Sequence, residues 1–485
     1  MQPAITTRAF WLRASVGLAA CAALLYLYVQ AVLYLSKALA DQPAKLALTA
    51  LALIAGAAIL IVVLRKPMLG YYGFVLTLPL SNLNIKLPFA TISPPNVFLI
   101  AATLGGIAQF ALRPHPQRKM PHGLPTRLLL IGWMLVATLV SISIAPNSGA
   151  TGRFLVTRIG YFLTFLVTFL FVDDLEKFAH VIRVALLGAC ISSTVAIGGA
   201  FLGFPDWLAR SVHTYLPVLN LPRTSAFDTS PHGFANWLLF ALAPALMSVF
   251  YPGLFGLRRR HAIGISCLLL AGILISQARG AWVALIVTAV VAFAVHAMPA
   301  RREGLARPAY VVGIILFVAV FGTLLFMFVI QPIISVRSVT FAQRIEEINF
   351  ALTMMQDHLL FGVGPLDDRI LGTLALGVPA VDNAFLIEGA STGLLGFIPF
   401  LLFWFSSMGS AGKLCLDAAG QPTYFAAKTL FFSLVLQFVS VQAYVAIGEK
   451  GPWLTMGLIA SIAAIAYRDR HQTQVASIAA AESSQ

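Results

Sequence analysis

Charged residues are scarce in this sequence. Asp, Glu, Lys and Arg make up only 10% of the 485 residues, whereas a soluble globular chain carries about 25%. Hydrophobic residues make up 59%, and the mean hydropathy is +0.88. This composition excludes a soluble enzyme and a disordered chain. Because apolar segments take up almost all of the length, any chemistry must use the ends of membrane spans and short loops.

Metal-binding patterns are also missing. None of the four cysteines stands in CxxC spacing, and the nine histidines lack the paired spacing that a metal site needs. We therefore expect no metal and no other cofactor. The net charge is +14, but in a membrane protein an excess of Lys and Arg marks the cytoplasmic loops. No nucleic-acid partner is expected.

The long apolar runs predict the fold class. About twenty apolar residues cross a bilayer, and the sequence holds about 12–14 such runs, which predicts an all-α polytopic integral membrane protein. Arg8 and Arg13 precede a first run that is too long for a cleavable signal sequence. The N-terminus is therefore expected in the cytoplasm. Every second gap between runs is rich in Lys and Arg, which agrees with this orientation and predicts a cytoplasmic C-terminus.

The domain organisation follows from the same runs. Residues 1–472 are predicted to form a single transmembrane domain, and the Ala- and Ser-rich tail 473–485 is predicted to be a disordered cytoplasmic segment. Two external loops, 203–233 and 331–383, exceed the usual loop length. Long loops in compact proteins are usually functional or disordered, so these two are the first places to look for a site.

The second long loop contains a helical pattern. Apolar residues recur at helical spacing between Phe341 and Leu359, with polar residues on the other face. This predicts an amphipathic helix near 341–360 that lies over the external surface of the membrane. Residues 384–407 then form the next predicted span, and a tight hairpin is predicted at 261–298.

Five arginines on the external side are candidates for binding an anion. A guanidinium at membrane depth is costly, and its planar fork of donors suits phosphate oxygens. The five are Arg153, Arg158, Arg223, Arg279 and Arg344. Structural alternatives stay open, because Arg153, Arg158 and Arg279 could anchor span ends by snorkelling. Arg223 could pair with Asp228, and Arg344 with a glutamate of its own helix.

Four further residues are candidates for acid–base or positioning roles. Asp382 and Asn383 lie where the second external loop enters the next span, so Asp382 could act as a general base or cap the helix. Glu388 lies inside an apolar run, where it is either functional or paired with an arginine. His358 is a weaker candidate base.

Three motifs in a fixed order resemble a known family. The first is a Ser-x-x-Arg-Gly turn that contains Arg279, and the second runs from Arg344 to Gly-Val-Gly-Pro365. The third begins at Asp382-Asn383 and ends at Gly396. Together they resemble the O-antigen ligase and O-antigen polymerase superfamily of bacterial envelope proteins, over roughly residues 150–410.

The resemblance implies a metal-independent glycosyltransferase at the periplasmic face of the bacterial inner membrane. Its donor would be a glycan on undecaprenyl diphosphate. The resemblance assigns the diphosphate to Arg223 and Arg279, supported by Arg153, Arg158 and Arg344. It assigns the acceptor hydroxyl to Asp382, with Glu388 and His358 as alternative catalytic residues and Asn383 in acceptor positioning.

One departure from the family pattern selects between two activities. Ligases of this family have a His-Asn pair where this chain has Asp382-Asn383, which favours a polymerase that joins lipid-linked repeat units into exopolysaccharide or O-antigen. The alternative is a ligase that moves the glycan to lipid A core or to a protein, and a transporter or flippase is the alternative of another class. The expected partners are the undecaprenyl-diphosphate-linked glycan and membrane lipids, with a chain-length regulator and a flippase as candidate protein partners.

Overall fold

The computed structural model describes the chain over twelve stretches and the single pair Val62–Val63. These stretches are residues 65–80, 85–86, 91–112, 124–144, 148–204, 211–215, 222–228, 230–297, 338–364, 383–417, 421–443 and 450–483. The chain divides into two compact units, of which the first comprises Met1–Val75 with Pro94–Lys119 and the second the remainder. The first unit contains helix α4 (Pro94–Leu112) and most of α3 (Pro67–Thr77).

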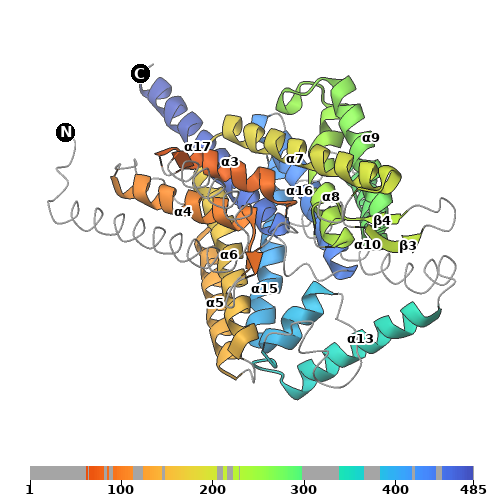
Figure 1. Cartoon of the computed structure of the whole chain (residues 1–485). Coiled ribbons are helices and arrows are strands. Elements are labelled where there is room, and N and C mark those ends of the chain that lie inside the picture. Colours follow the sequence, from red (N-terminus) through yellow and green to blue (C-terminus); the bar gives the residue numbers. More distant parts are fainter. Residues whose placement is uncertain are drawn as a thin grey trace, which may run out of the picture. The chain divides into compact units, whose positions relative to one another are not determined.

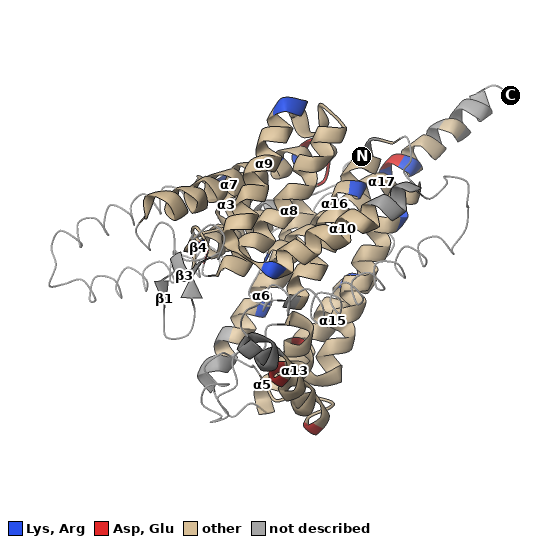
Figure 2. Ribbon diagram, turned by 90° about the vertical axis from the view of Figure 1, so that its right-hand side faces the viewer, with Lys and Arg blue, Asp and Glu red and all other residues tan. Residues whose placement is uncertain are grey.

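The prediction of an all-α polytopic membrane protein is confirmed. Within the described stretches, seven helices are long and apolar enough to cross a membrane, and two shorter apolar helices accompany them. Figure 2 shows how few charged residues these helices carry along their length. Three of the apolar runs counted in the sequence lie wholly or almost wholly outside the described residues: those near 14–36, 45–64 and 309–331.

The second unit consists mainly of long helices. In chain order they are α5 (Leu124–Ile144), α6 (Ser148–Phe171), α7 (Leu175–Leu202), α8 (Pro231–Phe250), α9 (Arg259–Ser276), α10 (Arg279–Ala297), α13 (Ser338–Asp357), α15 (Ala384–Asp417), α16 (Pro422–Ser440) and α17 (Gly451–Ser483). The short 3₁₀ helices η1 (Leu254–Gly256) and η3 (Val441–Ala443) follow α8 and α16. The hairpin predicted at 261–298 corresponds to α9 and α10.

Two helices form the centre of this unit. Helix α8 packs against α9 and α16, and α16 also packs against α10, α15 and α17 (Figure 1). Nearly every side chain of α8 is buried, and the sequence of this helix is apolar on all of its faces. A helix with no polar face belongs in the interior of a bundle or of a membrane protein, which is where α8 lies.

Small residues allow close packing between α6 and α17. A Cβ added at Gly457 would come within 2.9 Å of the Phe165 carbonyl oxygen and 2.8 Å of Thr168 Cβ. The Ser461 hydroxyl of α17 donates to the Thr168 carbonyl at 3.3 Å. Small residues and interhelical hydrogen bonds hold membrane helices together, because lipid offers no hydrophobic drive for their association.

Helix α15 reverses its direction, which corrects the prediction of one continuous span at 384–407. Gly393 has φ 60° and ψ −166°, a backbone conformation that is essentially restricted to glycine. In an unbroken helix, residues 385 and 400 would be roughly 22 Å apart along the axis. Instead the rings of Phe385 and Phe400 are 5.4 Å apart, and Phe385 also reaches Trp404 at 6.0 Å. The first two turns of α15 therefore fold back along the rest of the helix.

The segment after α13 closes this reversal through backbone hydrogen bonds. The N–H of Val363 donates to the Ala390 carbonyl at 2.9 Å, and the N–H of Leu394 donates to the Leu359 carbonyl at 2.8 Å. Helix α13 lies crosswise to α15 in Figure 1 and occupies the region where the sequence predicts an amphipathic helix near 341–360. Its buried face carries Glu347 and Ala351, whereas apolar residues such as Leu352 are exposed.

Strands occur only as two short antiparallel pairs in the described stretches. Strand β1 (Ile85–Lys86) pairs with β2 (Thr91–Ile92), and β3 (Ser211–Tyr215) pairs with β4 (Pro222–Thr224). The second pair lies in the first external loop predicted at 203–233, which therefore contains a hairpin and the start of α8.

The C-terminal tail departs from its predicted disorder. Helix α17 continues to Ser483 and so includes residues 473–483 of the segment 473–485 that was predicted to be disordered. The tail contains several alanines and neither Gly nor Pro. Alanine has the highest intrinsic helix propensity, so nothing in this stretch stops a helix that the transmembrane part has already nucleated.

Candidate functional site

Strand β4 places Arg223 against the turn between α9 and α10. Its Nε donates to the Ser276 carbonyl oxygen at 2.9 Å, and its Nη2 lies 2.8 Å from Nε2 of His232 in the first turn of α8. Helix α9 ends where Gln277 adopts a left-handed conformation with φ 51°. Arg279 follows as the first residue of α10. The structure thus brings two predicted anion-binding arginines to one helix turn.

This turn is suited to bind an anion. The first N–H groups of a helix have no partner within the helix, and its N-terminus carries a partial positive charge. The Arg279 side chain is partly exposed, and its guanidinium has no hydrogen-bond or ion-pair partner within the described stretches. Two guanidinium groups beside the N-terminus of α10 can donate several charge-assisted hydrogen bonds to phosphate oxygens.

A second group of predicted residues forms a buried ion pair. Nη2 of Arg158 on α6 contacts Oε2 of Glu388 on α15, and each side chain is only 1% exposed. The Thr392 hydroxyl lies 3.2 Å from the other carboxylate oxygen, and the ring of Phe154 lies 4.8 Å from the Arg158 guanidinium carbon. Of the alternatives that the sequence left open for Glu388, the structure shows the pairing with an arginine. A catalytic role for Glu388 stays a prediction.

Asn383 is the N-cap of α15. Its Oδ1 accepts hydrogen bonds from the backbone N–H groups of Phe385 and Leu386 at 2.9 and 3.1 Å. Its Nδ2 donates to the carbonyl and the side-chain oxygen of Gln442 in η3, at 3.0 and 3.3 Å. Asn383, rather than Asp382, therefore caps this helix. These bonds join the start of α15 to η3 and fix where the predicted acceptor-binding segment enters the bundle.

The remaining predicted residues are only partly described. His358 is exposed and follows directly after α13, and its carbonyl accepts from the N–H of Gly362 at 2.9 Å. The backbones of Arg153 and Arg344 belong to α6 and α13, and their side chains lie outside the described part. Asp382 also lies outside the described residues. Its role as catalytic base stays a prediction.

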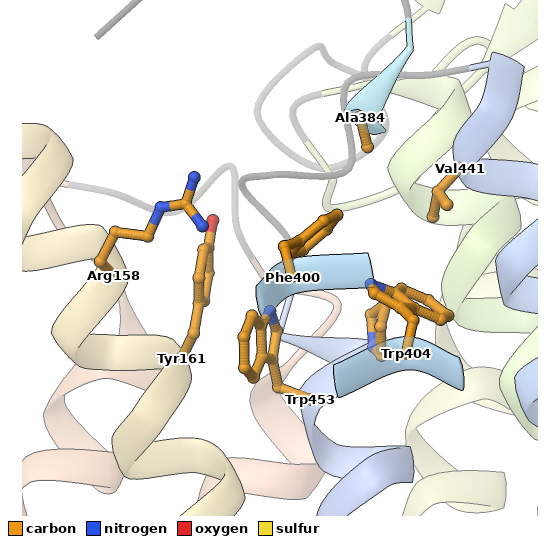
Figure 3. A pocket seen from close by; sticks show the side chains of 8 residues that line it. Arg158, Tyr161, Ala384, Phe400, Trp404, Val441 and Trp453 are labelled. Atoms are coloured by element: carbon orange, nitrogen blue, oxygen red, sulfur yellow. The ribbon is translucent and has the colours of Figure 1, made fainter. Parts of the chain in front are cut away.

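An aromatic pocket lies beside the Arg158–Glu388 pair and was missed by the sequence analysis. Figure 3 shows Arg158 and Tyr161 on one side of it and Phe400 and Trp404 on the other. Its empty volume is about 320 Å³, part of which is open to solvent. The lining comes from α6, α15, η3 and α17, so no local sequence pattern could have revealed it. Its complete lining is Arg158, Tyr161, Ala384, Phe400, Trp404, Val441, Pro452 and Trp453.

Lys450 is a second residue that the sequence analysis missed. It stands directly before α17, and its Cε lies 3.7 Å from the position that a Cβ on Gly160 of α6 would occupy. Burial lowers the pKa of Lys450 to about 8. The only signal in the sequence was a lysine next to the start of a predicted span, a position where lysines usually extend into solvent.

The fold and these groups define a class of protein: a multi-pass α-helical membrane protein with arginines gathered at the ends of its helices. Residues 264–401 match a family model described as O-antigen ligase. The matched region contains Arg279 and the whole reversal of α15. The match confirms, over this part of the chain, the resemblance found in the sequence. No curated protein sequence matches the chain.

Proposed function

We propose that this protein transfers a glycan from undecaprenyl diphosphate to an acceptor hydroxyl at the periplasmic face of the inner membrane. The proposal depends on the position of two arginines: Arg223 contacts the turn between α9 and α10, and Arg279 begins α10. The guanidinium of Arg279 is partly exposed and has no partner in the described part of the chain. A permanently charged group of this kind, beside a helix N-terminus and within the region of the family match, suits a diphosphate.

The proposed chemistry uses these arginines on the leaving group. The bond between the anomeric carbon of the donor sugar and the diphosphate oxygen breaks, and a new bond forms from the acceptor oxygen to that carbon. Negative charge develops on the departing diphosphate, where preorganised donors lower the barrier most. Arg223 is held by the Ser276 carbonyl and by His232, so its orientation is fixed before the donor arrives.

The acceptor must lose a proton during this transfer. We assign its removal to Asp382, which directly precedes the helix-capping Asn383 in the sequence. Glu388 is less suited to this task, because Arg158 and Thr392 already engage its carboxylate oxygens. A carboxylate that stabilises a buried guanidinium would have to give up that interaction in order to accept a proton.

Two acceptors fit this chemistry. A second lipid-linked repeat unit would make the protein a polymerase, and the Asp382-Asn383 pair in place of His-Asn supports this choice. Lipid A core or a protein would make it a ligase, and the description of the matching family supports that alternative. We favour the polymerase, because the sequence departs from the ligase pattern at the position of the base.

The first experiment compares wild type with Arg279→Ala and Arg279→Lys. Each purified protein is incubated with the lipid-linked oligosaccharide of its host in the presence of a chelator, and product length is read by gel and mass spectrometry. Arg260→Ala is the matched control, because Arg260 is an exposed arginine at the opposite end of α9. The polymerase proposal predicts a ladder from wild type and from the control.

The substitutions separate charge from geometry. Arg279→Ala should reduce the rate by about two orders of magnitude or more, the scale of losing one donor to a developing anion. Arg279→Lys should recover only part of it, because an ammonium cannot form the bidentate fork. If Arg279→Ala still produces the ladder of polymer lengths at the wild-type rate, Arg279 does not bind the diphosphate. Transfer only to added lipid A core would establish the ligase, and no transfer to any acceptor would overturn the glycosyltransferase proposal.

A further inference from the structure

The contact between Arg223 and His232 is chemically consistent in only one direction. Nη2 of Arg223 lies 2.8 Å from Nε2 of His232. A guanidinium carries only donors and keeps its proton at every pH a protein meets, so Nε2 is the acceptor. An imidazolium has no acceptor nitrogen, and a neutral imidazole accepts at only one of its two nitrogens. His232 is therefore neutral in this structure, with its proton on Nδ1.

The short segment before His232 is fixed by its own hydrogen bonds. The Ser225 hydroxyl donates to the Asp228 carbonyl at 2.8 Å, and Asp228 Oδ1 accepts from the N–H of Ser230 at 3.1 Å. Ser230 then caps α8, because its hydroxyl accepts from the N–H of Gly233 at 2.9 Å. His232 thus stands in the first turn of a capped helix, and its position is set by the loop itself.

The guanidinium of Arg223 is held at two separate points. Its Nε donates to the Ser276 carbonyl at the end of α9, and its Nη2 donates to His232 at the start of α8. One hydrogen bond lets a planar group turn about that bond, whereas two bonds from different nitrogens fix its plane. Arg223 and His232 are both partly exposed, so the oriented guanidinium is not shut off from solvent.

A neutral partner differs in its effect from a charged one. A carboxylate would cancel the charge of the arginine, as Glu388 does for Arg158. A protonated histidine would repel the guanidinium. A neutral imidazole orients the arginine without adding or cancelling charge, which suits a guanidinium that has to attract an anion.

We propose that His232 is a positioning residue: its neutral ring, accepting at Nε2, fixes the guanidinium of Arg223 in the orientation that meets the diphosphate. This inference rests on the proposed function and adds to it a residue that acts through Arg223. Donors that are already aimed stabilise the charge on the departing diphosphate best, because no energy is spent on turning them during the reaction. Loss of the acceptor at Nε2 should therefore lower the turnover rate more than the affinity for the donor.

The kinetic test compares two substitutions that differ in where they place an amide oxygen. In His232→Gln this oxygen can reach the position of Nε2, whereas in His232→Asn it lies nearer the backbone, at the position of Nδ1. His261→Gln is the matched control, because His261 is exposed at the opposite end of α9 from the turn. We expect His232→Asn to lower kcat for glycan transfer about ten- to a hundredfold and to change KM less than about threefold. His232→Gln and the control should retain most of the wild-type kcat.

A double variant shows whether His232 acts through Arg223. In an Arg223→Ala background, His232→Asn should cause no further loss of kcat, because the group that His232 orients is already gone. Additive losses would overturn the inference, since His232 would then act independently of Arg223. Equal kcat values for wild type, His232→Asn and His232→Gln would also overturn it and would leave the proposed function intact.

A measurement without turnover tests the contact itself. Wild type with ¹⁵N-labelled histidine is studied by NMR in lipid bilayers at neutral pH, and the signals of His232 are those missing from His232→Gln. We expect a neutral ring with its proton on Nδ1, and a shifted Nε2 signal in Arg223→Ala. A protonated ring, or a proton on Nε2, would overturn the inference. The expected signals from a protein that transfers no glycan would uphold the contact between the two side chains and reject the proposed function.

Discussion

The buried ion pair between Arg158 and Glu388 gives the sharpest prediction for stability. Both side chains are 1% exposed, so removing one partner leaves the other charge buried without compensation. Such a loss costs about 3–5 kcal/mol, whereas replacing both partners with apolar residues of similar volume is often neutral. We therefore expect Arg158→Met and Glu388→Leu each to be strongly destabilising. The double variant should be much more stable than the sum of the two effects predicts.

The coupling energy from the four proteins measures the interaction between the Arg158 and Glu388 side chains. Each single variant should lose about 3–5 kcal/mol, so a double variant near wild-type stability gives a coupling of about 6–10 kcal/mol. The contact between Arg158 and the Phe154 ring, at 4.8 Å, adds a smaller loss to Arg158→Met, on the order of 1 kcal/mol. Because the double variant also lacks this contact, it should remain slightly less stable than wild type.

The assay is reversible unfolding in mixed detergent and SDS micelles, read by tryptophan fluorescence for wild type, both single variants and the double variant. Additive effects, or single variants that lose less than about 1 kcal/mol, would show that the charges are not buried together as the structure has them. Glycan transfer by the folded double variant would further exclude Glu388 as the catalytic base. Loss of transfer with retained stability would support that role.

Two further changes test the reversal of α15 and the burial of Lys450. Gly393→Ala should destabilise the fold by several kcal/mol, about 1–3 from the backbone conformation alone, since the new Cβ would lie 2.5 Å from the Leu360 carbonyl. Gly409→Ala on the same helix meets nothing within 4 Å and should be neutral or stabilising in the same unfolding assay, and equal effects would contradict the reversal. The Lys450 pKa of about 8 lies below its unfolded value, so the unfolded state binds more protons between pH 8 and 10.5. Stability should rise with pH across that window by at most about 3 kcal/mol, and Lys450→Met should remove this slope, whereas an unchanged slope would place the titrating group elsewhere.

The sequence predicts those features that depend on local pattern. Apolar runs predict the membrane helices, and a Ser-x-x-Arg-Gly turn between two of them predicts where Arg279 lies. The helical spacing of apolar residues after Phe341 predicts α13. In each case the periodicity or the turn residues lie within one element, so no knowledge of its neighbours is needed.

The missed features depend on contacts between distant segments. Gly393 in an apolar run is indistinguishable from an ordinary residue of a span, and its reversal is closed by backbone groups that lie some thirty residues earlier, around Leu359 and Val363. The aromatic pocket draws its rings from α6, α15 and α17. The burial of Lys450 likewise depends on α6, which precedes it by almost three hundred residues.

The two groups of arginines show why residue type alone could not assign a role. Arg158 and Arg279 have the same chemistry and both stand near predicted span ends, but the fold neutralises the first with Glu388 and leaves the second without a partner in the described stretches. Because Glu388 lies 230 residues after Arg158, no local pattern could separate the arginine that is held in an ion pair from the one whose charge is left to attract an anion.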